Sequence, residues 1–233
     1  MADPPIDPKL REFYERSYHG TSAFREGTTE WKLRHLYELC AGVPHATVLD
    51  VGAGEGSFAQ RFCDDGFALE VTALEVSSSA VAAIKSRDIA CLVDAAVFGG
   101  SALPHDDDSF DLVTMINVMD HAENPRLLLR EAARVGRHVY IHVPLEDTLR
   151  LDCSTEAVGR ISFFSHKTMR SLVRTTGLEL VGERISVAPG TDADRGRTRR
   201  ARVKQAAHRV LPRAAEALFT YHLSLLCRRP PVR

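Results

Sequence analysis

The sequence has few cysteines, no long apolar run and no export signal. Its five cysteines are odd in number, and none forms a C-x-x-C pair. This usage argues against a zinc site or a disulfide framework and is typical of a reducing cytosol, so we expect five small, buried thiols. No apolar stretch approaches the roughly 20 residues that a membrane-spanning helix needs, and the first ten residues lack a basic-then-apolar pattern. These absences predict a cytoplasmic protein without a membrane span.

The charge is nearly balanced overall but uneven along the chain. The net charge is −1, whereas residues 190–233 hold 11 Lys/Arg against 3 Asp/Glu, which leaves an acidic body. Eight Lys/Arg lie in 195–213, where alanines and valines recur every three to four residues. This predicts an amphipathic helix in a basic segment at about 191–217. Most basic runs of this kind are solvated helix faces, which is the leading interpretation. The second is a binding surface for a phosphorylated or carboxylated acceptor. Nucleic-acid binding is the third, because the segment lacks aromatic residues for base stacking.

Short apolar strands alternate with helical patterns along most of the chain. Strand patterns cover 46–51, 68–76, 89–93, 110–116, 137–143, 178–188 and 219–227, and helical patterns cover 8–18, 30–40, 57–65, 77–87, 124–135 and 165–177. Strands and helices at this spacing predict an α/β fold with a mostly parallel, doubly wound sheet. We expect a helical lid over 1–45 and one main domain over 46–233.

A glycine-rich turn, "VGAGEGS", follows the first strand and contains Gly52, Gly54 and Gly56. In open α/β sheets, ligands bind at the carboxyl ends of the strands. The spacing differs from the G-x-G-x-x-G of dinucleotide binders, and Asp50 would repel a pyrophosphate. Glu75, 23 residues beyond Gly52, can accept hydrogen bonds from both ribose hydroxyls. These features favour an adenosine ligand that is cationic and lacks phosphate, namely S-adenosylmethionine.

Four segments in order resemble a known enzyme family. They are "VLDVGAGEGSFAQ", "VTALEVS", "LPHDDDSFDLVTMINVMDHAENP" and "FFSHKTMRSLVRTTGLELV". Together they resemble class I S-adenosylmethionine-dependent methyltransferases, in the broad group that acts on small metabolites, including sugars, quinones and secondary metabolites. The resemblance covers about residues 46–185. It implies a Rossmann-like, seven-stranded sheet in the order 3-2-1-4-5-7-6, with the last strand antiparallel.

The resemblance also implies how the cofactor is held. The glycine turn would border the methionine part, Asp50 would orient its amino end, and Asn117 would add contacts. Glu75 would hold the ribose. In the family, an acidic residue after the third strand reads the adenine amino group; Asp94 is the preferred candidate here, and counting back from the Leu-Pro pair gives Ser101 instead.

Catalysis of methyl transfer needs few special groups, because the sulfonium methyl is already activated. The acceptor must be held in line with the carbon–sulfur bond of the cofactor, in a site that excludes water. A general base is needed only if the acceptor loses a proton. His121, after the fourth strand, is the candidate base, and tying its loop to the next helix is its alternative role. The candidate acceptor contacts are Tyr14, Tyr18, Trp31, His142 and Glu146.

Each acceptor candidate also has a structural alternative. The aromatic residues could anchor the N-terminal helices on the core, and Glu146 could lie in a solvated loop. For His142, inside the fifth strand, core packing is favoured over catalysis. No histidine forms an H-E-x-x-H pattern, so we expect no metal.

The expected function is methyl transfer from S-adenosylmethionine to an oxygen, with nitrogen second, of a small-molecule acceptor. An RNA-modifying methyltransferase on the same fold is the first alternative. A nicotinamide-dependent oxidoreductase is disfavoured by Asp50 and by the glycine spacing. A relative that binds the cofactor without turnover is the third.

Overall fold

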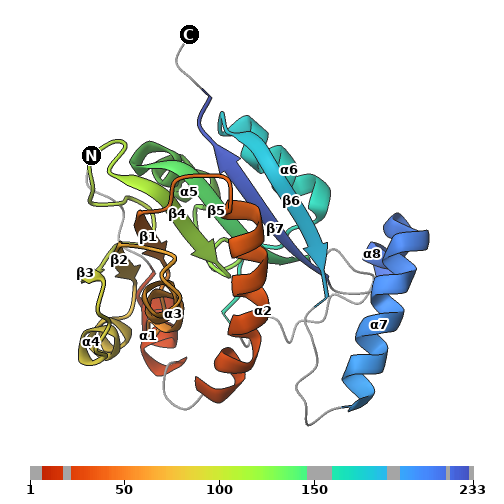
Figure 1. Ribbon diagram of the computed structural model, residues 1–233, viewed down its shortest axis with the longest axis horizontal. Coiled ribbons are helices and arrows are strands. Elements are labelled where there is room, and N and C mark those ends of the chain that lie inside the picture. The colour runs from red at the N-terminus through yellow and green to blue at the C-terminus, as the bar shows by residue number, and fades with distance from the viewer. Residues whose placement is uncertain (1–6, 18–21, 146–158, 188–194, 219–220, 231–233) are drawn as a thin grey trace.

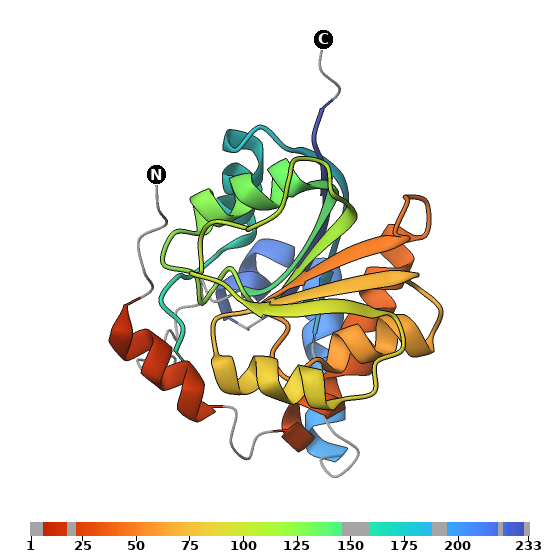
Figure 2. The same ribbon diagram turned by 90° about the vertical axis from the view of Figure 1, so that its left-hand side faces the viewer.

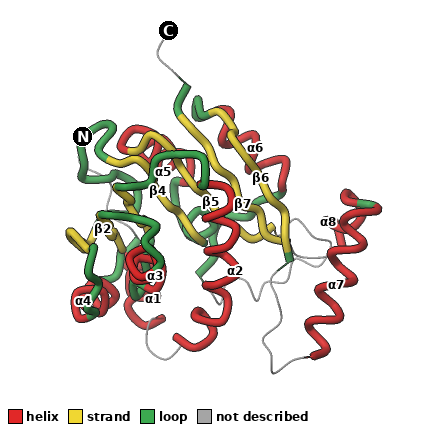
Figure 3. Tube along the Cα trace, viewed as in Figure 1, coloured by secondary structure: helices red, strands yellow, loops and turns green. Residues whose placement is uncertain are grey.

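The computed structural model describes residues 7–17, 22–145, 159–187, 195–218 and 221–230. The strands are β1 (Thr47–Val51), β2 (Glu70–Glu75), β3 (Leu92–Val97), β4 (Phe110–Ile116), β5 (Gly136–Leu145), β6 (Glu179–Ser186) and β7 (Tyr221–Arg228). The helices are α1 (Pro8–Ser17), α2 (Ser22–Cys40), α3 (Ser57–Asp64), α4 (Ser78–Ser86), α5 (Pro125–Val135), α6 (His166–Thr175), α7 (Arg195–Val210) and α8 (Pro212–Leu218). Figure 3 shows how helices and strands alternate along the chain.

The strands form one seven-stranded sheet in the order β3-β2-β1-β4-β5-β7-β6 (Figure 1). Strands β1 to β5 pair in parallel, and β7 pairs antiparallel with both β5 and β6. The predicted fold class, strand order and antiparallel last strand are therefore confirmed. Strands β1 to β6 end at one edge of the sheet, which we call the carboxyl edge.

Helices cover both faces of the sheet (Figure 2). On one face, α5 and α6 contribute Leu128, Leu129 and Met169 to a buried apolar cluster. On the other face, α2 and α3 contribute residues such as Leu36 and Phe62 to a second cluster. Strands β1 and β4 supply side chains to both clusters, because alternate residues of a strand point to opposite faces.

Two element boundaries differ from the sequence expectation. Helix α2 begins at Ser22 and runs through Gly27, whereas the helical pattern in the sequence began only at residue 30. Strand β3 covers Leu92–Val97 instead of 89–93. Ile89 lies before the strand and is buried there. Strand β3 itself is at the edge of the sheet and has several exposed residues. The apolar run at 89–93 therefore lies mostly before β3 rather than within it.

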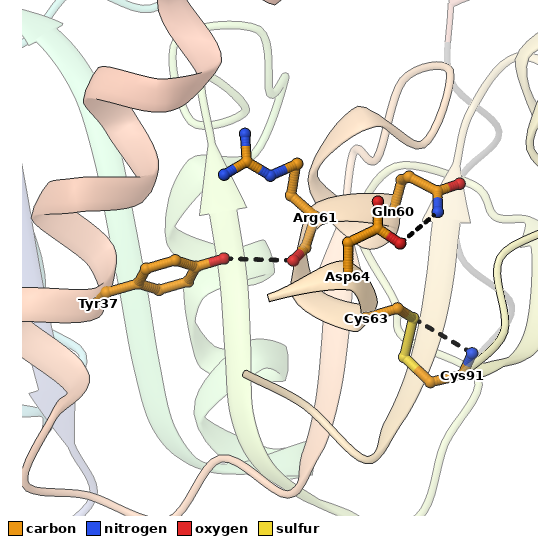
Figure 4. The surroundings of a disulfide bond; sticks show 6 residues. All are labelled: Tyr37, Gln60, Arg61, Cys63, Asp64 and Cys91. Carbon is orange, nitrogen blue, oxygen red and sulfur yellow. Dashed lines mark hydrogen bonds between the residues drawn. A yellow bond between two sulfur atoms is a disulfide. The ribbon is translucent and has the colours of Figure 1, made fainter. Parts of the chain in front are cut away.

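The cysteine prediction is wrong for one pair. Cys63, at the end of α3, forms a disulfide with Cys91, just before β3, with their Cα atoms 5.6 Å apart (Figure 4). Cys40 and Cys227 are buried free thiols as expected, and Cys153 lies outside the described residues. The two bonded cysteines are 28 residues apart, so only the packing of α3 beside β2 and β3 brings them together.

Candidate functional site

The glycine turn after β1 is packed too tightly for side chains. Gly52 has φ +69°, and a Cβ there would lie 2.5 Å from a methyl carbon of Val118. Its N–H donates to the carbonyl oxygen of Leu74 at 2.7 Å. Glycine is thus required by both backbone conformation and space. The turn lies at the carboxyl edge, and the missing Cβ of Gly52 makes room for Val118.

Glu75 ends β2 and is fixed against this turn. Its side chain is buried, and its Oε2 accepts the N–H of Gly54 at 2.9 Å. Its Oε1 accepts the N–H of Val76 at 2.7 Å. A carboxylate oxygen can accept more than one hydrogen bond. Glu75 is therefore a preorganised acceptor beside the glycine turn, although the same bonds also give it a structural role.

Asp50 is a buried acid with one oxygen unsatisfied. Thr114 donates from Oγ1 to its Oδ1 at 2.7 Å, and its Oδ2 has no hydrogen-bond partner in the described part of the chain. Burial raises the pKa of Asp50 to about 7, against the Thr114 hydrogen bond and with a smaller contribution from Glu75. A buried acid with a free oxygen is well suited to a cationic ligand group.

Asn117 provides a second unsatisfied polar atom at the same edge. It follows β4 with φ +56°, and its Oδ1 is buried without a partner among the residues described. Its N–H donates to the carbonyl oxygen of His142 at 2.8 Å. The positive φ and the unsatisfied amide oxygen are features that bound ligands commonly account for.

The structure does not support the preferred adenine-reading residue. Asp94 lies inside β3, paired in register with Thr72 rather than with Glu75 at the end of β2. At about 3.3 Å per residue, this is roughly 10 Å short of the carboxyl edge. Its side chain is 61% exposed and lies 3.9 Å from Nζ of Lys85. Ser101, the alternative, is buried in the loop after β3 and remains a prediction.

The structure brings His121 and Tyr14 together, which the sequence could not show. Nδ1 of His121 lies 3.1 Å from the Tyr14 hydroxyl oxygen and 3.0 Å from the carbonyl oxygen of Gly159. Burial, and then the negative charges of Asp120 and Glu75, raise the pKa of Tyr14. Tyr14 is therefore a neutral hydroxyl at physiological pH, within hydrogen-bond reach of the candidate base.

Asp120 lies near the other ring nitrogen of His121. Its buried Oδ2 lies 3.5 Å from Nε2 of His121 and 3.1 Å from Nε of Arg160. Its carbonyl oxygen accepts the N–H groups of Ile161 and Ser162. The sequence analysis singled out neither Arg160 nor Gly159, because both reach this group from a distant segment.

Helix α1 spans the loops beside the glycine turn. At one end, the N–H of Asp7 donates to Oε1 of Glu123 at 2.9 Å. At the other, Glu15 accepts the N–H groups of Ser78 and Ser79 at 2.7 and 3.1 Å, at the start of α4. Figure 1 shows α1 at the end of the molecule toward which β4 and β6 point. Helix α1 thus connects the loop after β4 to the loop after β2.

Glu15 behaves as an external cap for α4. Burial alone would raise its pKa, but hydrogen bonds from Ser79, Ser78 and Ser77 lower the pKa of Glu15 to about 2. A carboxylate at a helix N-terminus is stabilised by the free N–H groups there. The ionised form of Glu15 therefore attaches α1 to the main domain at neutral pH.

Trp31 and His142 also meet, inside a cluster of rings. The Trp31 ring packs edge-on against His35, His142 and His222, with centroids 5.1, 5.3 and 5.0 Å away. His142 is fully buried, and its Nδ1 lies 2.9 Å from Oγ of Ser224. Burial holds the pKa of His142 well below its usual value. The surroundings of His142 are those that the packing alternative predicts.

Two further acceptor candidates cannot be placed relative to these groups. Tyr18 and Glu146 lie outside the described residues. Among the residues described, no group of three or more His, Cys, Asp or Glu is placed to hold a metal ion. None of the described helices has the length and apolarity needed to cross a membrane.

Comparison with known proteins finds a methyltransferase domain within the chain. Residues 49–138 match the family model described as methyltransferase domain. The demethylmenaquinone methyltransferase of Renibacterium salmoninarum is 34% identical over 112 residues, or 47% of this chain and 44% of that protein. The ubiquinone biosynthesis O-methyltransferase of Alkalilimnicola ehrlichii is 23% identical over 161 residues, or 60% of this chain and 63% of that protein. The chain thus spans less than two thirds of the length of either relative.

A solved structure shows the same fold over almost the whole chain. It is a methyltransferase of Haloferax volcanii, in complex with the methyltransferase activator Trm112. Its TM-score is 0.71 at 20% identity, covering 96% of this chain and 99% of that one. Residues 49–138 thus match a methyltransferase domain, and the chain as a whole has the fold of this solved structure.

Proposed function

We propose that the protein transfers a methyl group from S-adenosylmethionine to an oxygen of a small metabolite. The observation that carries the proposal is the unsatisfied Oδ2 of buried Asp50 beside a turn where Gly52 cannot bear a side chain. A cationic ligand with an unphosphorylated adenosine fits this edge, whereas a pyrophosphate would meet two buried carboxylates, those of Asp50 and Glu75. When bound, S-adenosylmethionine supplies an activated methyl group.

Different residues would bind different parts of the cofactor. Asp50 pairs with the amino group, and Asn117 offers its amide oxygen to the same end of the ligand. Glu75 receives the ribose hydroxyls, and Ser101 is the nearest polar candidate on the adenine side. Asp50, Glu75 and the amide oxygen of Asn117 are buried, and a low-dielectric environment strengthens the contacts that they make.

We further propose that α1 and α2 form the lid expected over residues 1–45. Tyr14 and Glu15 attach α1 near the proposed cofactor groups. Trp31 of α2 packs against the ring of His142, and the carbonyl oxygen of His142 accepts the N–H of Asn117. His121 remains the candidate base where the acceptor loses a proton; its Nδ1 lies 3.1 Å from the Tyr14 hydroxyl, and its Nε2 lies 3.5 Å from Oδ2 of Asp120. Since two relatives are named for quinone pathways, phenolic and quinol hydroxyls are the first acceptors to test.

The proposal predicts that Glu75→Ala weakens S-adenosylmethionine binding about 100-fold. Two lost hydrogen bonds to a charged group, at about 1.5 kcal/mol each, give this magnitude. Calorimetric titration measures the effect. Glu70→Ala, an exposed acid at the far end of β2, is the matched control and should bind as the wild type does. Unchanged affinity in Glu75→Ala, in a folded protein, would show that the ribose is held elsewhere.

Transfer itself separates an enzyme from a protein that only binds the cofactor. Labelled methyl from S-adenosylmethionine should appear in a phenolic or quinol acceptor, or in small molecules of a cell extract. Label confined to RNA would instead support the RNA-modifying alternative. Tight cofactor binding without label in any fraction would support a non-catalytic relative.

The lid proposal predicts that Glu15→Gln speeds release of the bound cofactor. A neutral amide retains one acceptor oxygen but loses the charge that the start of α4 stabilises, which costs roughly 1 kcal/mol and gives a fivefold faster release. Stopped-flow displacement of the cofactor measures the rate. Arg11→Gln, which removes an exposed charge on the same helix, should release at the wild-type rate. If both variants match the wild type, α1 does not cover the ligand.

A further inference from the structure

The connection between β6 and β7 contains a basic helix pair, α7 and α8, that packs on the body through a few described residues. The hydroxyl of Tyr221 donates to the carbonyl oxygen of Lys204 at 2.8 Å, and the ring of His208 lies 4.9 Å from that of Tyr221. Ala207 and Ala215 also pack against the core. These contacts attach α7 and α8 to the sheet, while Figure 1 shows α7 projecting beyond it.

The outer side of the helix pair combines exposed apolar and basic residues. Val203, Val210 and Leu211 are 57%, 76% and 64% exposed. Val203 and Val210 are two helical turns apart and so lie on one side of α7. Arg202 and Arg209 are exposed next to them. Residues 195–213 contain no acidic residue, so nothing within this segment neutralises the charge.

The position of the helix pair relates it to the site. Strand β6 ends at Ser186, which pairs in register with His222 at the start of β7. Leu145, the last residue of β5, pairs with Tyr221. The chain therefore leaves and re-enters the sheet at the carboxyl edge, where Asp50, Glu75 and Asn117 gather the cofactor groups.

We propose that α7 and α8 dock the protein on an anionic lipid surface. A basic amphipathic helix binds such a surface by combining apolar insertion with attraction to lipid headgroups. Nucleic acid would satisfy the arginines but would leave the exposed valines and leucine in water, and the segment offers no aromatic ring for base stacking. Docking through this edge places the candidate active site next to the bilayer, where an apolar acceptor would be dissolved.

Vesicle flotation of the full chain tests the proposal. Phosphatidylcholine vesicles that contain phosphatidylglycerol should carry the protein, vesicles of phosphatidylcholine alone should not, and added salt should weaken the binding. The double variant Arg209→Glu with Val210→Ser should bind at least tenfold more weakly, because it reverses one charge and removes one inserting side chain. The matched control, Arg130→Glu with Leu127→Ser on exposed positions of α5, should bind as the wild type does.

Several results would overturn the proposal. These are no binding to anionic vesicles, equal binding to both vesicle types, or equal binding by the α7 variant once circular dichroism shows it folded. Single-stranded RNA that displaces the protein from vesicles, and binds it more tightly than they do, would assign the segment to nucleic acid instead. Flotation needs neither cofactor nor turnover, so its failure would leave the methyl-transfer proposal standing, and the reverse also holds.

Discussion

Replacing Asp50 by asparagine is expected to weaken S-adenosylmethionine binding about 100-fold at pH 7.5 and to remove most of its pH dependence. The ionised carboxylate has an unsatisfied oxygen at the buried edge where we place the ligand's amino group. Loss of a buried, charge-assisted hydrogen bond costs roughly 3 kcal/mol, which corresponds to this factor.

The pH dependence follows from the pKa of Asp50, which burial raises to about 7. A bound cation favours the ionised form, so the complex holds fewer protons than the free protein and affinity rises with pH. Below pH 7 the wild-type affinity should fall toward tenfold per pH unit. Above about pH 8 the amino group of the ligand loses its own proton. Binding should therefore be tightest between these values.

Calorimetric titration between pH 5.5 and 9 checks this result. Asp94→Asn, an exposed acid on β3, is the control and should retain the wild-type profile. Without ligand at pH 8, Asp50→Asn should be at least as stable as the wild type, because it removes a buried charge that folding disfavours. Wild-type affinity in Asp50→Asn, or an unchanged pH profile, would mean that this carboxylate does not hold the amino group.

Reduction of the Cys63–Cys91 disulfide is expected to lower the free energy of unfolding by about 3–4 kcal/mol. The bond closes a loop across a separation of 28 residues, and loop-closure entropy gives that magnitude. It lies at the start of β3, because Leu92 pairs with Val71 at the start of β2. Cofactor affinity should therefore change little.

Urea unfolding with and without a thiol reductant measures the difference. The double variant Cys63→Ser with Cys91→Ser should reproduce the reduced protein and should no longer respond to reductant. Because Cys40 and Cys227 are free and buried, they provide no second bond for the reductant to break. An unfolding curve of the wild type that does not move with reductant would show that the two thiols are unlinked in solution.

The sequence was informative where a local pattern decides the structure. Alternating strands and helices predicted the α/β class, and Gly52 and Asp50 marked the edge where we propose that the cofactor binds, because turn chemistry is local. The strand order came from the family resemblance rather than from the pattern itself. The basic segment was also predicted as a helix, and α7 covers Arg195–Val210.

Long-range packing explains what the sequence could not show. Three contacts join segments that are far apart in the sequence. The disulfide spans 28 residues, the Tyr14–His121 contact spans 107, and the attachment of Glu15 to α4 spans more than 60. Asp94, the preferred adenine-side candidate, lies within β3 because the strand begins three residues later than its apolar run indicated. That shift placed the acid inside the strand rather than after it.

The most direct test of the account is a crystal structure of the protein soaked with S-adenosylhomocysteine, which carries the same amino, carboxylate and ribose groups. The account predicts the amino group at Oδ2 of Asp50 and the ribose hydroxyls at Glu75, over the bare turn at Gly52. A ligand bound elsewhere, or a dinucleotide whose pyrophosphate occupies that turn, would contradict it.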